Sequence, residues 1–228
     1  MSVAIKIRQV KKMFREMRKV RVSDYENFLS KKYKFGNPDN SFIIRHYDDD
    51  VVRQEMLWAY PNDKETLAGR GFGVTADGHF KYELLLPTPA TKDDMEDFMK
   101  FACELAKYMR ATEIEIDGKF VAIKDIESKK EIVNQMQELN KNQLENLIGN
   151  YERAGVFTGS FHPVYLPRDE YNKIKNAKSE DVMAIFAGLL DKFQIRDIEK
   201  YKFMEPMFYQ NRENQRIQGV YTFEEGKV

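Results

Sequence analysis

The sequence predicts an α+β protein in which antiparallel β-hairpins pack against amphipathic helices. Two Asp-Gly pairs, Asp77-Gly78 and Asp117-Gly118, lie between β-rich segments and supply the positive φ angles that tight hairpins need. Apolar residues at helical spacing follow each of the two hairpins. Hydrophobic residues make up 42% of the 228 residues, including 16 Phe and 12 Tyr, which is more apolar surface than a disordered chain carries.

The first expected element is a strand at residues 3–8, because β-branched residues alternate along it. The apolar residues from Val3 to Met17 also fit a four-three helical spacing, so a helix is the alternative. The basic segment after the strand is expected to be irregular or extended. Ser23-Asp24-Tyr25-Glu26 forms a capping box, which predicts a short helix that stops near Gly36-Asn37-Pro38.

The central part predicts strands, two hairpins and one long helix. Single strands are expected at residues 42–47 and 56–60, a hairpin at 71–75 and 79–86 around Ala76-Asp77-Gly78, and a second hairpin at 113–116 and 119–123. Between the hairpins, Thr91 caps a helix with Asp94 at the box position. The apolar residues from Met95 to Met109 mark the buried stripe of this helix.

The last hundred residues predict further helices and strands. Ser128 with Glu131 opens a helix, and the apolar residues at 144–148 either extend it or form a second helix. The later elements are an edge strand at 156–166 that contains Pro163, helices at 168–174 and 180–193 of which the second is capped by Ser179, and closing strands at 199–204 and 217–223.

The chain also suggests two similar strand-helix-strand lobes. Segments 86–116 and 166–204 both read as a strand, a Leu-Pro pair, a helix with the pattern Phe-Ala-x-x-Leu-x-Lys-aromatic, and a strand. The alternative is that two amphipathic helices after strands resemble each other without duplication. We therefore expect lobes at 1–127 and 128–228, with one continuous domain as the alternative.

The overall charge bears on the partners that the protein takes. Its 37 basic and 37 acidic residues cancel, which argues against nucleic acid as the main partner. Residues 1–35 hold eleven basic and three acidic residues, so they carry +8 and the remainder −8. This segment is either a patch for an anionic partner or a solvated face whose charge acidic residues meet elsewhere in the fold.

Cysteine content and hydropathy indicate the compartment. The single cysteine, Cys103, excludes an internal disulfide and indicates a reducing environment. It lies in the predicted helix before the second hairpin, where a small inert helix residue is expected. No apolar run is long enough to span a bilayer, and the N-terminus lacks the apolar core of a signal peptide. We therefore expect a cytoplasmic protein without a membrane span.

Gly69-Arg70-Gly71-Phe72-Gly73 is the first candidate site, because it has the composition of a phosphate-binding loop. Such loops work when a helix N-terminus follows, whereas a strand is expected here. Glycines at alternating positions also mark a bulge or a close crossing of two backbone segments. Arg70 is nevertheless a candidate ligand for a carboxylate or phosphate, and the hairpin could bring His79 near it.

The remaining titratable residues do not form a recognisable metal or catalytic pattern. The three histidines, His46, His79 and His162, lack zinc-ligand spacing, and Asp48-Asp49-Asp50 lacks the length and glycine of a calcium loop. Ser160 and His162 share one strand face without the acid and oxyanion hole of a triad. We expect no metal and no cofactor.

Aromatic residues offer a second kind of site. Trp58 and Tyr60 lie two residues apart in a predicted strand, so both side chains face the same way and could form a binding platform. Core packing explains the pair equally well. A protein-partner surface, where Trp and Tyr are enriched, is a third explanation.

Two stretches resemble a known family. Gly69-Arg70-Gly71-Phe72 leads to Tyr82-Glu83-Leu84-Leu85-Leu86-Pro87-Thr88-Pro89, Asp94-Met95-Glu96 and Leu105-Ala106-Lys107, and Gly155-Val156 to Tyr165-Leu166 adds a second match. Over about half of its length the chain resembles an uncharacterised family of small cytosolic proteins from Gram-positive bacteria, known only as a domain of unknown function. The resemblance implies a bacterial cytosolic protein without an assigned activity, and it transfers no catalytic residue.

These observations favour a non-enzymatic interaction or binding protein, because no complete catalytic or cofactor set accompanies its aromatic and charged residues. Its partner is expected to be another protein or a small anion, and homo-oligomer formation is open. The alternative is an enzyme for a small molecule or phosphate with its site at Arg70 and His79. The four candidate ligand-binding residues are thus Arg70, His79, Trp58 and Tyr60.

Overall fold

The computed structural model has two compact units, residues 1–194 and 195–228, and each is described by itself. The structure describes residues 2–9, 20–38, 44–46, 56–62, 69–77, 81–127, 130–150, 156–158, 163–166, 168–178, 181–193, 207–210 and 217–220. In the second unit, β11 (Met207–Gln210) and β12 (Ile217–Val220) pair antiparallel as a two-stranded sheet.

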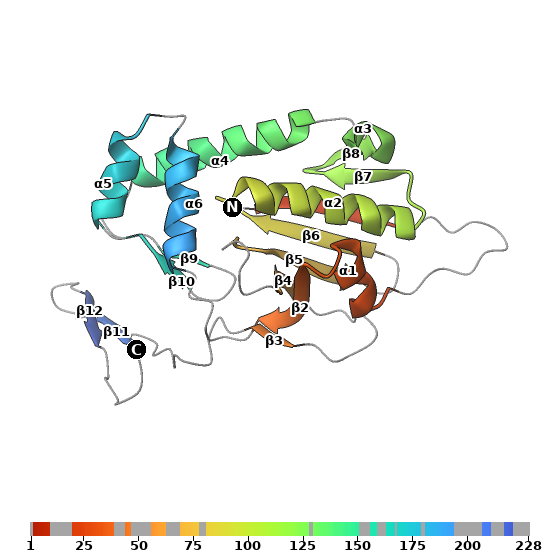
Figure 1. Ribbon diagram of the computed structural model, residues 1–228, viewed down its shortest axis with the longest axis horizontal. Coiled ribbons are helices and arrows are strands. Elements are labelled where there is room, and N and C mark those ends of the chain that lie inside the picture. The colour runs from red at the N-terminus through yellow and green to blue at the C-terminus, as the bar shows by residue number, and fades with distance from the viewer. Residues whose placement is uncertain are drawn as a thin grey trace. The chain divides into compact units, whose positions relative to one another are not determined.

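An eight-stranded antiparallel sheet forms the centre of the first unit (Figure 1). Its strands are β1 (Ser2–Arg8), β2 (Tyr33–Pro38), β3 (Ile44–His46), β4 (Met56–Pro61), β5 (Phe72–Asp77), β6 (Lys81–Pro87), β7 (Glu113–Ile116) and β8 (Lys119–Ala122). Their order is β3-β2-β4-β5-β6-β1-β7-β8. The first strand therefore lies between β6 and β7, which places the two hairpins on either side of it.

Six helices are present in the described part of the first unit. They are α1 (Val22–Phe28), α2 (Lys92–Tyr108), α3 (Ile123–Glu127), α4 (Lys130–Asn150), α5 (Arg168–Asn176) and α6 (Val182–Phe193). α1 and α2 contact each other, and α2 runs along β6 and β1 (Figure 1). The long α4 contacts α2 and also α5 and α6, so it links the sheet with the later helices.

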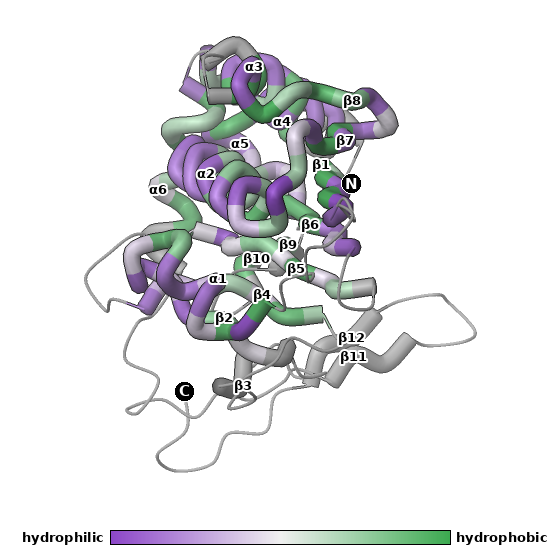
Figure 2. Tube along the Cα trace, turned by 90° about the vertical axis from the view of Figure 1, so that its right-hand side faces the viewer, coloured by the Kyte–Doolittle hydropathy of each residue, from purple (hydrophilic) through white to green (hydrophobic). Residues whose placement is uncertain are grey.

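A large hydrophobic cluster lies between the sheet and α1 and α2. Alternate residues of each strand face it, as in β1, where Val3, Ile5 and Ile7 are buried. Tyr25 of α1 and Phe101 of α2 are fully buried and their rings pack at a centroid distance of 5.2 Å. Figure 2 shows hydrophobic residues along β1, β4 and β6, whereas α1 and α2 carry many hydrophilic residues.

A second hydrophobic cluster lies among α4, α5, α6 and a short sheet. This sheet consists of β9 (Val156–Thr158) and β10 (Pro163–Tyr165), which pair antiparallel. The buried members of the cluster are Leu144, Val164, Leu166, Ile174, Val182, Phe186, Leu189 and Leu190. The first cluster draws its buried residues from positions 3–136 and the second from 144–190. The division into lobes at residue 127 and the internal duplication stay predictions.

The α+β class is confirmed, and so are most of the predicted elements. The long helix has the expected cap, since Thr91 Oγ1 accepts a hydrogen bond from the backbone N–H of Asp94 at 3.1 Å. Asp117 and Gly118 form the second hairpin turn with φ angles of 47° and 82°. α4 is one continuous helix, which settles the choice left open at 144–148. Cys103 is buried within α2, as expected for a small helix residue.

Several boundaries were wrong near the N-terminus. The capping box predicted at Ser23 and Glu26 is wrong: Ser23 lies inside the helix, which begins at Val22 after the N-cap Arg21, and the side chain of Asp24 accepts a hydrogen bond from the backbone N–H of Arg21 at 2.8 Å. The helix ends at Phe28, and residues 33–38 form β2 instead of a helix end, because this segment pairs with β4. In the first hairpin Ala76 pairs with Tyr82 and Asp77 with Lys81, so both belong to β5 rather than to the predicted turn at Ala76-Asp77-Gly78.

The later boundaries also differ. The predicted strand at 156–166 consists of two short strands, β9 and β10, which pair with each other. Residues 123–127 form the helix α3, which the sequence did not predict, and β11 was missed as well. The predicted caps Ser128 and Ser179 and the predicted strand at 199–204 lie outside the described residues.

Acidic residues elsewhere in the fold meet part of the N-terminal positive charge. Two lysines pair with acids outside the segment, Lys6 with Glu115 at 3.6 Å and Lys32 with Asp97, while Lys34 pairs at 3.0 Å with Glu26 of the same segment. For Lys6 and Lys32 the interpretation as a solvated face met by acids elsewhere agrees with the structure. The basic residues at 10–19 lie outside the described part of the chain, and an anionic partner for the whole segment stays a prediction.

Candidate functional site

The start of α2 is held by a buried carboxylate. Asp94 is only 1% exposed, and its side chain accepts four hydrogen bonds. The donors are the backbone N–H groups of Arg70 at 3.0 Å, Gly71 at 3.1 Å and Thr91 at 3.1 Å, and the hydroxyl of Thr91 at 2.8 Å. Burial raises the pKa of Asp94, and these hydrogen bonds oppose the rise. One side chain thus ties the loop before β5 to the helix that follows β6.

The glycines of this loop are required by close approach. A Cβ atom at Gly69 would lie 2.2 Å from Oδ1 of Asp94. At Gly71, where φ is +68°, it would lie 2.0 Å from the carbonyl oxygen of Ala59. The alternative interpretation of the glycine-rich segment, a close approach of two backbone segments, is therefore confirmed at Gly71, whereas the close neighbour of Gly69 is a side chain. A strand follows the loop, as expected, and Asp94 in the first turn of α2 accepts hydrogen bonds from two backbone N–H groups of the loop.

Arg70 reaches from this loop toward the second hydrophobic cluster. Its side chain is buried, its Nη1 donates a hydrogen bond to the carbonyl oxygen of Pro89 at 2.6 Å, and its guanidinium carbon lies 5.8 Å from the ring centre of Phe157. Burial lowers the pKa of Arg70 to about 10, with the charge of Asp94 opposing the shift. Phe157 packs edge-on against Phe186 of α6, so Arg70 connects the loop with the second cluster.

Asn140 of α4 completes the connection. It is fully buried, and its side-chain amide pairs with both backbone polar groups of Ala90. The N–H of Ala90 donates to Oδ1 at 2.7 Å, and Nδ2 donates to the carbonyl oxygen of Ala90. Nδ2 also lies 3.6 Å from the sulfur of Met183 on α6. A long-range amide pair of this kind fixes α4 against the segment that leads into α2.

These three side chains converge on one short segment. Arg70, Asp94 and Asn140 are the buried polar or charged residues among those that the structure describes. All three bond to Pro89-Ala90-Thr91, between β6 and α2. We call this arrangement the polar cluster. Because buried polar groups are costly unless they are paired, their convergence fixes the geometry of this junction.

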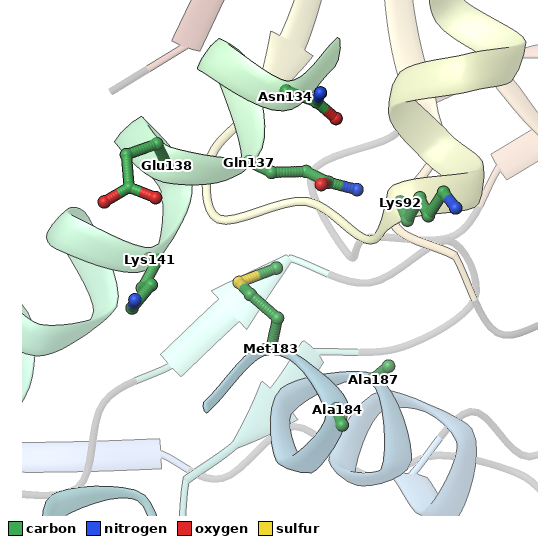
Figure 3. A pocket seen from close by; sticks show the side chains of 8 residues that line it. All are labelled: Lys92, Asn134, Gln137, Glu138, Lys141, Met183, Ala184 and Ala187. Carbon is green, nitrogen blue, oxygen red and sulfur yellow. The ribbon is translucent and has the colours of Figure 1, made fainter. Parts of the chain in front are cut away.

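An open groove lies beside the polar cluster (Figure 3). It has a volume of about 480 Å³ and is formed by α4, α6 and the first residue of α2. Its lining residues are Asn134, Gln137, Glu138 and Lys141 from α4, Met183, Ala184 and Ala187 from α6, and Lys92 from α2. None of them is fully buried, so the groove is wide open to solvent.

The groove contains two lysines and one acid. Lys92 directly follows Thr91, and Lys141 directly follows Asn140, so both lysines are attached to backbone that the polar cluster fixes. Figure 3 shows Gln137 extending from α4 toward Lys92, and Glu138 at the far end of the groove from Lys92. Lys92 also lies 3.7 Å from Glu96, one turn further along α2, in a pair with both side chains exposed. Such a pair holds a lysine only weakly.

A second hollow of about 600 Å³ lies on the other side of α6. Its lining residues are Lys173, Asn176 and Ala177 from α5 and the turn after it, and Asp181, Ala184 and Ile185 at the start of α6. Ala184 lines both hollows. The two depressions therefore meet at one exposed methyl group.

The candidate residues taken from the sequence lie elsewhere. Trp58 and Tyr60 both lie on β4 and are half-buried, and Trp58 Nε1 donates to the carbonyl oxygen of Arg70 at 3.1 Å. The indole of Trp58 also lies against Gly73 of the neighbouring strand. Burial raises the pKa of Tyr60, with Glu26 adding to the shift. None of the residues that line either hollow is Arg70, Trp58 or Tyr60.

The structure thus brings Trp58 and Arg70 together, but it leaves the proposed pairing of Arg70 with a histidine untested. His79 and His162 lie outside the described residues, and only the backbone of His46 is described. A ligand role for any of the four candidates stays a prediction. In the described part of the chain, no group of three or more His, Cys, Asp or Glu side chains is placed to hold a metal ion.

Sequence reasoning missed the residues that form the groove. Lys92 and Lys141 look like solvated helix residues, and Asn140 interrupts no motif. The only available signal was a polar residue at a position of α4 that faces inward, since Met136 and Leu144, four residues to either side of Asn140, are buried. An asparagine on the apolar stripe of a helix predicts a buried hydrogen-bond partner.

Comparisons with known proteins identify a family without giving an activity. A family model described as "Domain of unknown function (DUF4299)" matches residues 2–228. No curated protein and no solved structure matches the chain. Among the described residues, no helix has the length and apolar character to cross a membrane.

Proposed function

The chain belongs to the family described as domain of unknown function (DUF4299), and we propose that it is a non-enzymatic binding protein. Its binding site is the groove formed by α4, α6 and the start of α2, and its ligand carries carboxylates. The observation that carries the proposal is the pair Lys92 and Lys141, which stand on two different elements and border one open groove.

The polar cluster supports this role because it orients the two lysines. Thr91 and Asn140, their neighbours in sequence, are bound to Asp94 and Ala90, so the backbone of both lysines is fixed, while the residue Lys92 is exposed and Lys141 is half-buried. A site whose geometry exists before the ligand arrives loses less entropy on binding. The cations can therefore attract a carboxylate without reorganising the fold.

The openness of the groove favours binding over a chemical reaction. Four lining residues, Lys92, Asn134, Glu138 and Ala184, are exposed and the other four are half-buried. Catalytic sites gain most from electrostatic groups that are shielded from water. An open groove with lysines at its border instead suits a partner that binds and leaves, with an affinity that salt weakens.

Titration of the isotope-labelled protein with tetraglutamate, followed by NMR, tests the proposal. We expect amide shifts at the groove-lining parts of α4 and α6. Exposed ion pairs contribute up to about 1 kcal/mol each, so the double variant Lys92→Gln/Lys141→Gln should bind about tenfold more weakly. The double variant Lys100→Gln/Lys124→Gln removes two exposed lysines that do not line the groove and is the matched control.

The proposal fails if the groove variant binds tetraglutamate as well as the control variant does. It also fails if tetralysine produces the same shifts, because the site would then not select negative charge. Raising the salt concentration from about 50 to 500 mM should weaken binding of tetraglutamate, since the Debye length falls over this range.

A further inference from the structure

The two hollows lie on the two flanks of one exposed ridge of α6. Around a helix axis each residue turns by about 100°, so Met183 and Ala187 lie on one side of Ala184 and Asp181 and Ile185 on the other. Ala184 itself is exposed and lines both hollows. The ridge between the hollows is therefore a single methyl group.

The exposed ridge of α6 carries small side chains. Gly188, one turn after Ala184, is also exposed, and a Cβ atom there would meet nothing within 4 Å. From Ala187 to Asp181 the path along α6 is about 9 Å, because a helix rises about 1.5 Å per residue. A chain lying over Ala184 can thus occupy both hollows at once.

The polar groups of the two hollows match a polypeptide. Asn134 and Gln137 are one turn apart on α4, and Asn176 lies in the second hollow, so side-chain amides are present on both sides of α6. An amide side chain both donates and accepts, and can therefore bind the N–H and C=O groups of a peptide backbone. Met183 lines the first hollow together with Asn134 and Gln137, and its flexible side chain adapts to varied ligand shapes.

The charges favour an acidic sequence. Lys92 and Lys141 border the first hollow and Lys173 borders the second. Two acids, Glu138 and Asp181, lie among the lining residues and oppose them. Glu170 also pairs with Lys173 at 2.9 Å, but that lysine side chain is 62% exposed. The lining lysines exceed the lining acids by one; this excess lies in the first hollow, and Lys173 supplies the positive charge on the other side of the ridge.

We infer that the ligand is an acidic polypeptide segment that runs across Ala184 in an extended conformation, with carboxylates near Lys92 and Lys141 on one side and near Lys173 on the other. This inference rests on the proposed function of the first groove. Four extended residues span roughly 13 Å and eight span roughly 26 Å. The crossing from Ala187 to Asp181 takes about 9 Å of this length, so eight residues leave enough chain to occupy both hollows, whereas four leave only about one residue beyond the crossing.

Fluorescence anisotropy with labelled tetraglutamate and octaglutamate tests the inference. We expect the octamer to bind at least tenfold more tightly than the tetramer. Lys173→Gln should weaken octamer binding severalfold and leave tetramer binding unchanged, whereas Ala184→Leu, at a position that lines both hollows, should weaken octamer binding more than tetramer binding. Both positions are exposed, so the variants should fold. Lys175→Gln, an exposed neighbour on α5 that lines neither hollow, should change neither affinity.

Each outcome separates this inference from the proposed function. If octamer binding responds to Lys92→Gln/Lys141→Gln but not to Lys173→Gln or Ala184→Leu, the path across α6 is wrong and the first groove stands. If no lysine variant of the first groove affects either peptide, both proposals fail. If a linear octaphosphate binds as tightly as octaglutamate, the assignment of the ligand as a peptide is wrong.

Discussion

Replacing Asp94 by Asn changes one atom and tests how much the hydrogen bonds of this carboxylate contribute to the stability of the polar cluster. The carboxylate accepts four hydrogen bonds, three at Oδ2 and one at Oδ1. In the best orientation the amide oxygen takes the place of Oδ2 and keeps three donors. The amide nitrogen then faces the N–H of Gly71, which was 3.1 Å from Oδ1, so two donors oppose each other in a buried site.

The expected loss of stability follows from these contacts. A buried N–H left without an acceptor costs about 1–3 kcal/mol, and the three remaining bonds lose their charge assistance. Relief from burying a charge offsets part of this cost, because burial raises the pKa of Asp94. We expect a net loss of about 2 kcal/mol, which lowers the melting temperature of a unit of this size by roughly 4–8 °C.

Urea unfolding followed by tryptophan fluorescence is the suitable assay. Trp58 is the single tryptophan, and its indole N–H donates to the carbonyl oxygen of Arg70, next to the substituted site. Its emission therefore reports on the loop as well as on global unfolding. Asp93→Asn is the matched control, since it removes a half-buried charge from the same helix turn and should cost about 0.5 kcal/mol. If Asp94→Asn costs no more than this control, the role assigned to the carboxylate is refuted.

Three further changes follow from other buried or constrained groups. Tyr25→Phe should raise the free energy of unfolding by about 1 kcal/mol, because the buried hydroxyl has no hydrogen-bond partner among the described residues. Tyr33→Phe should lower it by about 1.5 kcal/mol, because it removes a 2.8 Å hydrogen bond to Asp97. If urea unfolding gives changes of the same sign for the two variants, this reasoning is contradicted. Gly188→Ala should stabilise the exposed part of α6 by about 0.5–1 kcal/mol in thermal unfolding, while Gly118→Ala at φ +82° should destabilise. Since the pKa of Asp94 is raised in the folded state, the folded protein binds the proton more tightly than the unfolded chain does. The stability of the wild type relative to Asp94→Asn should therefore fall as the pH rises from 3.8. If the difference between the urea midpoints of the wild type and the variant rises with pH instead, the prediction is wrong.

The elements that the sequence predicted correctly are those with local signals. α2 combines a capping box at Thr91 with an apolar stripe from Met95 to Met109, and both appear in the structure. The second hairpin depends on Asp117-Gly118, whose φ angles suit a tight turn. In each case the information lies within one turn or one helix face, so no distant partner is needed to read it.

One of the elements that were missed depends on a distant partner. Gly36-Asn37-Pro38 has the composition of a helix end, yet it belongs to β2, where Gly36 pairs with Trp58 of β4. Pairing between strands overrides local propensity in such segments. The strand at 156–166 was divided for a different, local reason, since β9 pairs with β10, which follows it closely in sequence.

The candidate site could be predicted only in part. The alternating glycines at 69–71 correctly indicated a close crossing of backbone, but the sequence gives no sign that Asp94 is the group that lies there. Asn140 bonds to Ala90, fifty residues away. A groove formed by α4 and α6 requires knowledge of how the two helices pack, which single-residue spacing does not contain.

The position of the polar cluster explains why polar groups are buried at this junction, although burying them costs free energy. Buried polar groups stabilise a fold less than apolar packing of the same volume, so a junction built only for stability would be apolar. Here Arg70 and Asn140 extend from different elements to adjacent residues, and their hydrogen bonds fix one arrangement of α4 relative to α2, where apolar contacts would tolerate several. The same hydrogen bonds fix the backbone positions of Lys92 and Lys141, which follow Thr91 and Asn140 in the sequence. A groove that recognises charge by the separation of two cations needs such a fixed junction, whereas a surface that only covers a hydrophobic core does not.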